Sequence, residues 1–182
     1  MTFKTFLSTA TAIALGTAVY AANPTVGGAP MLVERNIIEN AVNSPVHTTL
    51  VAAVKAADLV ETLQGPGPFT VFAPVNDAFA ALPAGTVETL LMPENKAMLQ
   101  KVLTAHVVAG DWSAADIIAA ARASKDGFYH FNAVSGDALS AQVKGNNVYI
   151  IDESGNAARV TVADVDQSNG VIHVINAVLV PK

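Results

Sequence analysis

Residues 70–79 read Thr-Val-Phe-Ala-Pro-Val-Asn-Asp-Ala-Phe, and we predict that the fold is organised around this stretch. Together with Phe69, its first half is a short apolar run of aromatic and β-branched residues between two prolines, which is typical of a buried strand. Pro74 ends the strand, because proline has no N–H to donate to a neighbouring strand. Asn76 or Asp77 is placed to cap the start of a helix. The stretch therefore predicts a core strand followed at once by a helix, with no side chain typical of catalysis.

A second apolar stretch, residues 169–181, reads Asn-Gly-Val-Ile-His-Val-Ile-Asn-Ala-Val-Leu-Val-Pro. Its odd and even positions are both mainly apolar, so this strand is predicted to be covered on both faces. The opening Asn169-Gly170 pair is a strong signal for a tight hairpin turn. His173 and Asn176 are polar members of the strand, and each is expected to find a hydrogen-bond partner.

The remaining sequence predicts helices in the first two thirds and strands in the last third. Apolar residues recur at helical spacing in residues 31–42, 50–57, 58–63, 86–91, 93–106 and 114–123. Ser113 is placed to cap the last of these helices. From Phe128 the apolar period changes to two, which predicts successive strands up to Val165. This order predicts a single domain of the α+β class.

The N-terminus predicts export from the cytoplasm. Residues 1–21 begin with a lysine at position 4, continue through an apolar segment of small residues and end in Tyr-Ala, which is typical of a secretory signal peptide cleaved after Ala21. Residues 22–30 are rich in glycine and proline and predict a flexible leader, either disordered or strap-like. Residues 31–182 form the predicted domain. The mature protein is expected to be periplasmic or extracellular.

Composition excludes several classes of partner and chemistry. The chain has 182 residues with 52% hydrophobic residues, no cysteine and a formal net charge of −5. Without cysteine there is no disulfide, thiol nucleophile or thiolate metal site. An acidic chain disfavours nucleic acid and anionic membrane as partners, since both require a basic face. We also expect no membrane insertion after the signal peptide is removed.

Motifs for catalysis or cofactor binding are absent from the sequence. There is no Gly-x-Ser-x-Gly elbow and no phosphate-binding loop. The four histidines form no close pair of the kind found in metal sites, so no metal or cofactor is predicted. His106 ends a predicted helix among apolar neighbours, which favours a buried histidine with satisfied hydrogen bonds. We predict that the protein is not an enzyme, with a hydrolase site assembled by folding as a remote alternative.

The two apolar stretches, about 90 residues apart with Leu-Thr-Ala-His-Val-Val at residues 103–108 between them, resemble the two signature boxes and the central histidine segment of the fasciclin (FAS1) domain. The resemblance covers residues 31–181. It implies a wedge-shaped β-sandwich with several short helices packed around it. The matching positions, which are mainly structural in the family, are Thr70, Phe72, Ala73, Pro74, Asn76, Ala78, Phe79, Asn169, Gly170, His173, Val174 and Asn176.

The family resemblance also implies a function in adhesion. Fasciclin domains are extracellular modules that bind a protein or matrix partner, and we extend this expectation to a polysaccharide at the cell surface. Asp164 and Val165 match an Asp-Ile pair proposed to contact integrins in animal relatives, with valine in place of isoleucine. His106 matches the histidine of a Tyr-His pair, with Ala105 in place of the tyrosine. These three residues are the candidate partner contacts, although Asp164 with Asp166 is also typical of a solvated turn.

Two further expectations concern how such a domain would work. A single domain without an anchor cannot crosslink two surfaces alone, so it would have to self-associate weakly or use its leader for a second partner. The high apolar fraction also suggests an alternative function, in which the protein carries a small apolar or lipid ligand between the helices and the sandwich. The aromatic cluster at residues 128–131 is expected to serve the core, with an exposed docking patch as the alternative.

Overall fold

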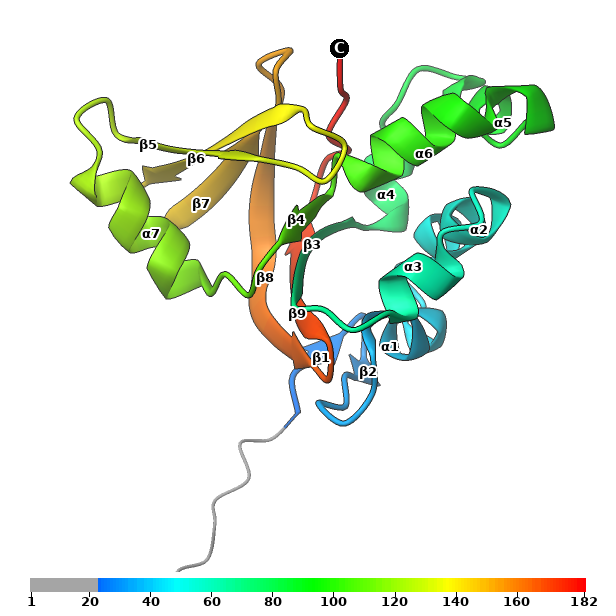
Figure 1. Cartoon of the computed structure of the whole chain (residues 1–182), viewed down its shortest axis with the longest axis horizontal. Coiled ribbons are helices and arrows are strands. Elements are labelled where there is room, and N and C mark those ends of the chain that lie inside the picture. Colours follow the sequence, from blue (N-terminus) through cyan, green and yellow to red (C-terminus); the bar gives the residue numbers. More distant parts are fainter. Residues whose placement is uncertain (1–22) are drawn as a thin grey trace, which may run out of the picture.

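A seven-stranded sheet forms one half of the described structure, and six of the seven α-helices found in residues 23–182 gather in the other half (Figure 1). The structure, a computed structural model, describes residues 23–182. The predicted signal peptide lies outside the described residues. The predicted α+β class is confirmed.

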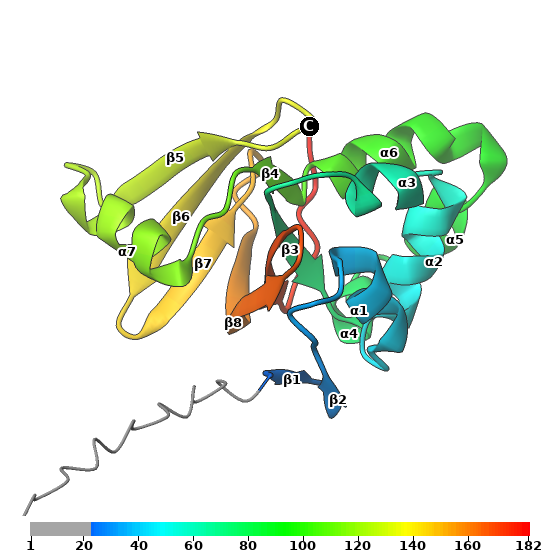
Figure 2. The ribbon, with the colours of Figure 1, turned by 60° about the horizontal axis from the view of Figure 1, so that its bottom comes forward.

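The helices are α1 (Ile37–Asn43), α2 (Thr48–Ala56), α3 (Val60–Gln64), α4 (Asn76–Ala80), α5 (Thr86–Leu90), the 3-10 turn η1 (Pro93–Asn95), α6 (Lys96–Thr104) and α7 (Ala114–Ala123). The strands are β1 (Thr25–Val26), β2 (Ala29–Pro30), β3 (Phe69–Pro74), β4 (Val107–Ala109), β5 (Phe128–Asn132), β6 (Ala138–Lys144), β7 (Asn147–Ile151), β8 (Ala157–Gln167) and β9 (Gly170–Ile175). Helix α7 packs on β5 and β6, away from the other helices (Figures 1 and 2).

The large sheet has the strand order β4-β3-β9-β8-β7-β6-β5. A sandwich has two layers of strands. Here the strands of the two layers are hydrogen-bonded to one another in one continuous sheet. The two layers are joined by the long strand β8, which pairs with β7 near its start and with β9 along the rest of its length. The register of β8 against β9 shifts twice, between Val160 and Val162 and between Val162 and Val165. Such irregularities bend a strand and increase its twist, and they let one sheet enclose a core.

The two signature stretches form neighbouring strands at the centre of the fold. Strands β3 and β9 pair in parallel, with Phe72 opposite His173 and Phe69 opposite Gly170. The side chains of residues 171–175 are all buried, so the prediction that this strand is covered on both faces is confirmed. One face of the central strands packs with the six-helix group and the other packs with α7 and strands β5 to β8.

Some helix caps come from a residue next to the helix in the sequence, and others come from a distant residue. Ser113 caps α7 as predicted, in a capping box with Asp116. The predicted cap of α4 by Asn76 or Asp77 is wrong, because the N-cap residue is Val75 and makes no side-chain bond. Instead the Asn76 Oδ1 atom accepts the Thr49 N–H at 3.0 Å and so caps the neighbouring helix α2. Asn76, the first residue of α4, therefore links α4 to α2.

The leader segment is structured from Thr25 onward. Strands β1 and β2 pair as a small antiparallel hairpin, and the Val26 side chain is buried against the helical half of the core. Residues 25–30 are therefore a strap on the domain and not a disordered tail, because Val26 gains apolar contacts by packing. Across the described residues, no helix is long and apolar enough to cross a bilayer.

Candidate functional site

His106 lies in the interior and both of its ring nitrogens are bonded. Its Nδ1–H donates to the Val102 carbonyl at 2.8 Å, and its Nε2 accepts the Leu179 N–H at 2.9 Å. Because the side chain is fully removed from water, burial lowers the pKa of His106 to about 4. The ring is therefore neutral at pH 7. It supports the C-terminal segment from inside and, at 2% exposure, does not reach the surface.

His173 is a second buried, neutral histidine with two partners. Its Nε2–H donates to the Trp112 carbonyl at 2.8 Å, and its Nδ1 accepts the Asp164 N–H at 3.2 Å. The ring stacks on Phe72 with 5.7 Å between ring centroids. Burial lowers the pKa of His173 as well. This histidine joins the central strands to the start of α7.

The polar residues of the signature stretches bind main-chain groups. The Thr70 hydroxyl donates to the Gly110 carbonyl and accepts the Trp112 N–H. The Asn169 side chain accepts the Ile37 N–H and donates to the carbonyls of Leu63 and Gly65. Asn176, which is exposed, accepts the Arg159 N–H. These residues hold segments of the chain together through main-chain hydrogen bonds.

Asp164 and Val165 point in opposite directions. Val165 has no exposed surface and belongs to the core, so it cannot touch a partner from this position. Asp164 is exposed, and its Oδ1 accepts the Ala114 N–H at the first turn of α7 at 2.7 Å. Its backbone is left-handed, with φ of 54°, inside strand β8. The interpretation of Asp164 as a solvated turn is therefore wrong, because the turn begins only after Gln167.

We expect Asp164→Ala to destabilise the domain by about 1–2 kcal/mol, because it removes a helix cap and places alanine in the left-handed region. From the sequence alone, Asp164→Ala is expected to leave the fold intact. The hydrogen bond between Asp164 and the Ala114 N–H of α7 leads us to expect a loss of stability instead. Asp164→Asn keeps an acceptor and a residue that tolerates this backbone, so its loss should be about 0.5 kcal/mol or less. Chemical denaturation of both variants at pH 7 measures the difference. Equal stability of the two variants would show that the Asp164 side chain does not hold α7.

Exposed carboxylates surround the start of α7. They belong to Asp111, Asp116, Asp164 and Asp166, and we call them the acidic face. The His173 ring bonds both the Asp164 N–H and the Trp112 carbonyl, so Asp164 and the residue next to Asp111 meet at this histidine. Asp111, Asp164 and Asp166 each oppose the lowering of the His173 pKa by burial. None of the four carboxylates forms an ion pair with a residue in the described part of the chain. The partly buried Trp112 lies between Asp111 and the helix.

In the part of the chain that the structure describes, histidine and hydroxyl side chains meet in two places, and neither provides an accessible nucleophile and base. Ser44 Oγ lies 2.8 Å from His47 Nδ1, but these residues are only 2% and 4% exposed, so a substrate has no access. At the surface, Ser124 and His130 both bond to Asp126, and the histidine does not bond the serine. Within residues 23–182, no three potential metal ligands gather at one point.

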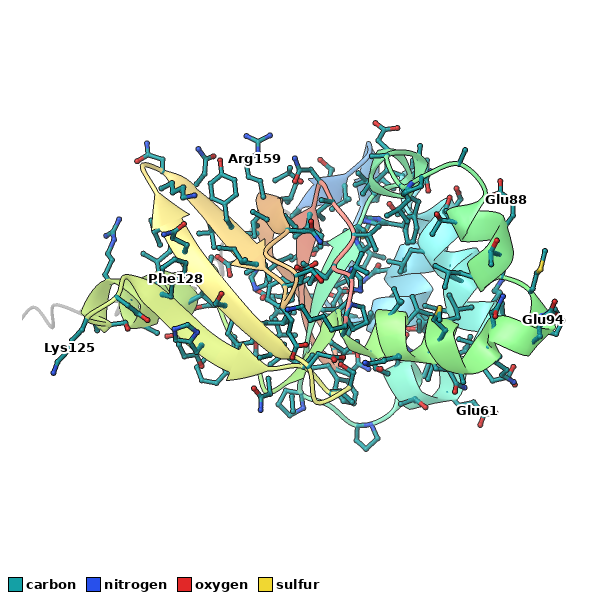
Figure 3. All side chains as sticks on the ribbon, turned by 90° about the horizontal axis from the view of Figure 1, so that it is seen from above. Glu61, Glu88, Glu94, Lys125, Phe128 and Arg159 are labelled. Carbon is teal, nitrogen blue, oxygen red and sulfur yellow. The ribbon has the colours of Figure 1, made fainter. Side chains whose placement is uncertain are left out.

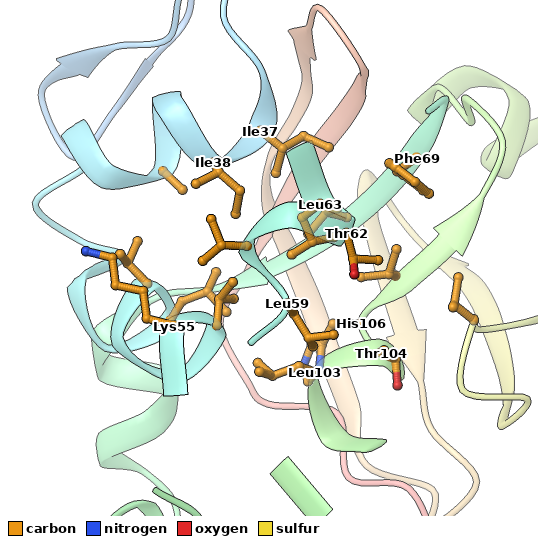
Figure 4. Close-up of a pocket in the computed structure, with 18 of the residues that line it drawn as sticks. Ile37, Ile38, Lys55, Leu59, Thr62, Leu63, Phe69, Leu103, Thr104 and His106 are labelled. Atoms are coloured by element: carbon orange, nitrogen blue, oxygen red, sulfur yellow. The ribbon is translucent and has the colours of Figure 1, made fainter. Parts of the chain in front are cut away.

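An apolar cavity lies between the helices and the sheet, where the carrier hypothesis placed its ligand. Its volume is about 60 Å³, and Figure 4 shows side chains of α1, α2, α3 and α6 around it, including Ile37, Leu63 and Leu103. For comparison, an engineered apolar cavity that binds benzene has a volume of about 150 Å³. The space is therefore too small for a lipid, and the geometry does not favour a carrier that uses this position.

The aromatic cluster on β5 is divided between core and surface. Tyr129 and Phe131 stack on each other, and Tyr129 also contacts Trp112. Phe128 and the exposed His130 stack on the other face of the strand, and Phe128 lies near the end of the sheet in Figure 3. Half of the cluster thus serves the core, as expected.

Comparison with known proteins gives consistent matches along the chain. The family described as "Fasciclin domain" matches residues 45–181. A relative from Synechocystis, "Protein sll1483", is 54% identical over 145 residues, which cover 80% of this chain and 73% of that protein. The "Cell surface glycolipoprotein MPB83" of Mycobacterium bovis is 31% identical over 180 residues, covering 93% of this chain and 72% of the relative.

A solved structure shares the fold at low sequence identity. It is a FAS1 domain pair from the insect cell adhesion molecule Fasciclin I, with a TM-score of 0.70 and 19% identity. The similarity covers 84% of this chain and 52% of that one. The arrangement of sheet and helices described above is therefore that of a FAS1 domain.

Proposed function

Because this chain belongs to the fasciclin domain family, we propose that it is an exported recognition or adhesion domain that binds a protein partner through the acidic face. Family membership indicates an adhesion or extracellular function in general terms, while the partner and the binding surface are specific to this proposal. The predicted signal peptide and the similarity to a cell-surface glycolipoprotein support a location in the periplasm or outside the cell.

The uncompensated acidic face is the observation that carries the proposal. Four exposed carboxylates, none of which forms an ion pair within residues 23–182, raise the local negative potential, and such a surface attracts and orients a partner with a basic patch. Trp112 adds a partly buried aromatic ring, a residue type that is common at protein interfaces. An acidic polysaccharide would be repelled here, so a protein is the favoured partner.

Of the three candidate contacts suggested by the sequence, Asp164 alone is part of the proposed surface. Val165 and His106 support it or its neighbours from the interior. We propose no catalytic role for the domain, because its buried histidines use both ring nitrogens for main-chain bonds or, in His47, have no access to solvent. Weak self-association would provide the several binding sites that adhesion requires.

The proposal predicts that the double variant Asp111→Asn/Asp166→Asn loses about tenfold in retention on cell-surface fractions. Both carboxylates are exposed and neither holds α7 in place, so the variant should fold normally. Retention of the unmodified domain should also fall as salt concentration rises, since exposed charges are screened. The measurement incubates purified mature protein with cell-surface fractions and quantifies the retained protein by immunodetection.

The matched control is Glu88→Gln/Glu94→Gln. It removes the same amount of charge from exposed side chains of α5 and η1, which lie at the far end of the molecule from α7 (Figures 1 and 3). We expect its retention to stay within about twofold of the unmodified domain. Equal losses of retention in the two double variants would indicate that retention depends on net charge only. The acidic face would then not be the binding surface.

A further inference from the structure

A long apolar groove runs between α5, α6 and the C-terminal segment. Its volume is about 470 Å³, which lies in the usual range for small-molecule sites and far exceeds the internal cavity. Figures 1 and 2 both show the C-terminal segment passing beside α6. The apolar lining residues are Leu82, Leu90, Ala97, Met98, Val102, Val178, Val180 and Pro181.

Most side chains of the groove are apolar, and some of these apolar side chains are exposed. Met98 is 60% exposed and Val180 is 37% exposed, whereas Val102 and Val178 form a buried floor. Exposed methionine is adaptable, because its unbranched side chain can adjust to the shape of a ligand. The groove therefore exposes apolar surface that a second molecule could cover.

Two lysines lie together at this groove. The Lys101 ammonium donates to the Lys182 carbonyl and lies 3.4 Å from the Asp137 carboxylate. The Lys182 ammonium forms no ion pair with any residue in the range 23–182. An acidic protein thus presents an available cation beside an apolar groove whose lining contains two lysines and no acidic residue.

We propose that this groove binds a single-chain anionic amphiphile, with the hydrocarbon chain along α6 and the carboxylate at Lys182 and Lys101. A carboxylate complements the lysine pair, and a hydrocarbon chain complements the apolar lining. The site lies outside the acidic face and is independent of the proposed adhesion function. The apolar composition suggests a lipid ligand in the space between the helices and the sheet. The site proposed here for such a ligand is in a different place.

The shape and chemistry of the groove disfavour a peptide. An extended peptide brings main-chain N–H and C=O groups that need partners, and Thr86, Lys101 and Lys182 are the polar side chains of the lining. A helix satisfies its own main chain, but it is about 10–12 Å wide, so a volume of 470 Å³ would hold only about one turn. A hydrocarbon chain is narrow and needs no hydrogen bonds.

The test measures binding of dodecanoate to the purified mature protein by calorimetry, with dodecanol and dodecyltrimethylammonium as probes of equal chain length. We expect dodecanoate to bind about fivefold more tightly than dodecanol and the cationic probe to bind most weakly. Lys182→Gln should remove the preference for dodecanoate over dodecanol. Lys125→Gln, an exposed lysine after the end of α7, should leave that preference unchanged.

The groove itself is tested with a matched pair of methionines. Met98→Glu places a charge in the groove wall and should weaken dodecanoate binding about tenfold. Met92→Glu adds the same charge at an exposed methionine outside the groove, and its affinity should stay within about twofold. Asp111→Asn/Asp166→Asn should bind dodecanoate normally, which separates this site from the acidic face.

Three results would overturn the proposal. The first is a lack of dodecanoate binding to the unmodified protein. The second is equal loss of binding in the Met98 and Met92 variants. The third is binding of an amphipathic helical peptide that depends on Met98 while dodecanoate does not bind, since the groove would then be a protein-docking site.

Discussion

Replacing Gly170 by alanine is expected to destabilise the domain by about 4 kcal/mol or more and to prevent folding in most of the purified protein. A Cβ atom at this position would overlap the Phe69 carbonyl oxygen and lie 2.7 Å from the Phe69 nitrogen. Both are main-chain atoms of the neighbouring strand β3, so neither can move without breaking the register of β3 with β9. The backbone φ of 149° adds strain for any residue with a side chain.

Gly155→Ala provides the control for this prediction. Gly155 also has a left-handed backbone, with φ of 85°, but no atom lies within 4 Å of the position that an added Cβ atom would take. Its loss should therefore be about 1–2 kcal/mol, which is the strain of the backbone alone. Circular dichroism and denaturant unfolding compare the two variants. A Gly170→Ala protein as stable as Gly155→Ala would mean that β3 and β9 do not approach as closely as described.

Acidification is expected to lower the free energy of unfolding by about 3 kcal/mol between pH 7 and pH 4 through His106 alone. The unfolded pKa of 6.5 is lowered to about 4 in the folded protein by burial. The unfolded chain therefore binds the proton first, and stability is lost as the pH falls through this window. Protonation would also convert Nε2 from an acceptor into a donor opposite the Leu179 N–H, which would release the C-terminal segment.

The pH effect is isolated by comparing the unmodified protein with His106→Gln. The variant should be less stable at pH 7, because it disturbs two buried bonds, and the difference should shrink by about 3 kcal/mol at pH 4. Parallel pH profiles of the unmodified protein and His106→Gln would contradict the assignment of the effect to His106. Burial lowers the pKa values of His47 and His173 too, so some acid sensitivity should remain in His106→Gln.

The central strands could be predicted from sequence because their signal is local and strong. Residues 69–74 and 171–175 are apolar on both faces, and only a strand in the middle of a fold can bury both. Ser113 was also predictable, because its capping partner Asp116 is three residues away. Patterns of this kind depend on neighbours along the chain.

The features that the sequence did not predict depend on contacts between distant residues. Asn76 caps a helix that begins 28 residues earlier, and Asp164 caps one that begins 50 residues earlier. The burial of Val165 follows from the register of β8, which two irregularities shift. A single sequence contains no local signal for such pairings.

The apolar groove and the acidic face also required the structure. Met98 has the same helical spacing as the buried Leu99 and Val102, yet it lies at the edge of the apolar stripe and is exposed. The acidic face combines residues from the start of α7 with residues from β8, about 50 positions apart. Only the packing of α7 against the sheet brings these carboxylates together.

Hydrogen–deuterium exchange of the mature domain, with and without the protein that it retains from cell-surface fractions, tests the acidic face most directly. We predict slower exchange in the partner complex for the amides of residues 111–116 and 164–166, with no change in α5 and α6. Protection confined to α5, α6 and the C-terminal segment, with the start of α7 exchanging as in the free domain, would contradict recognition through the acidic face.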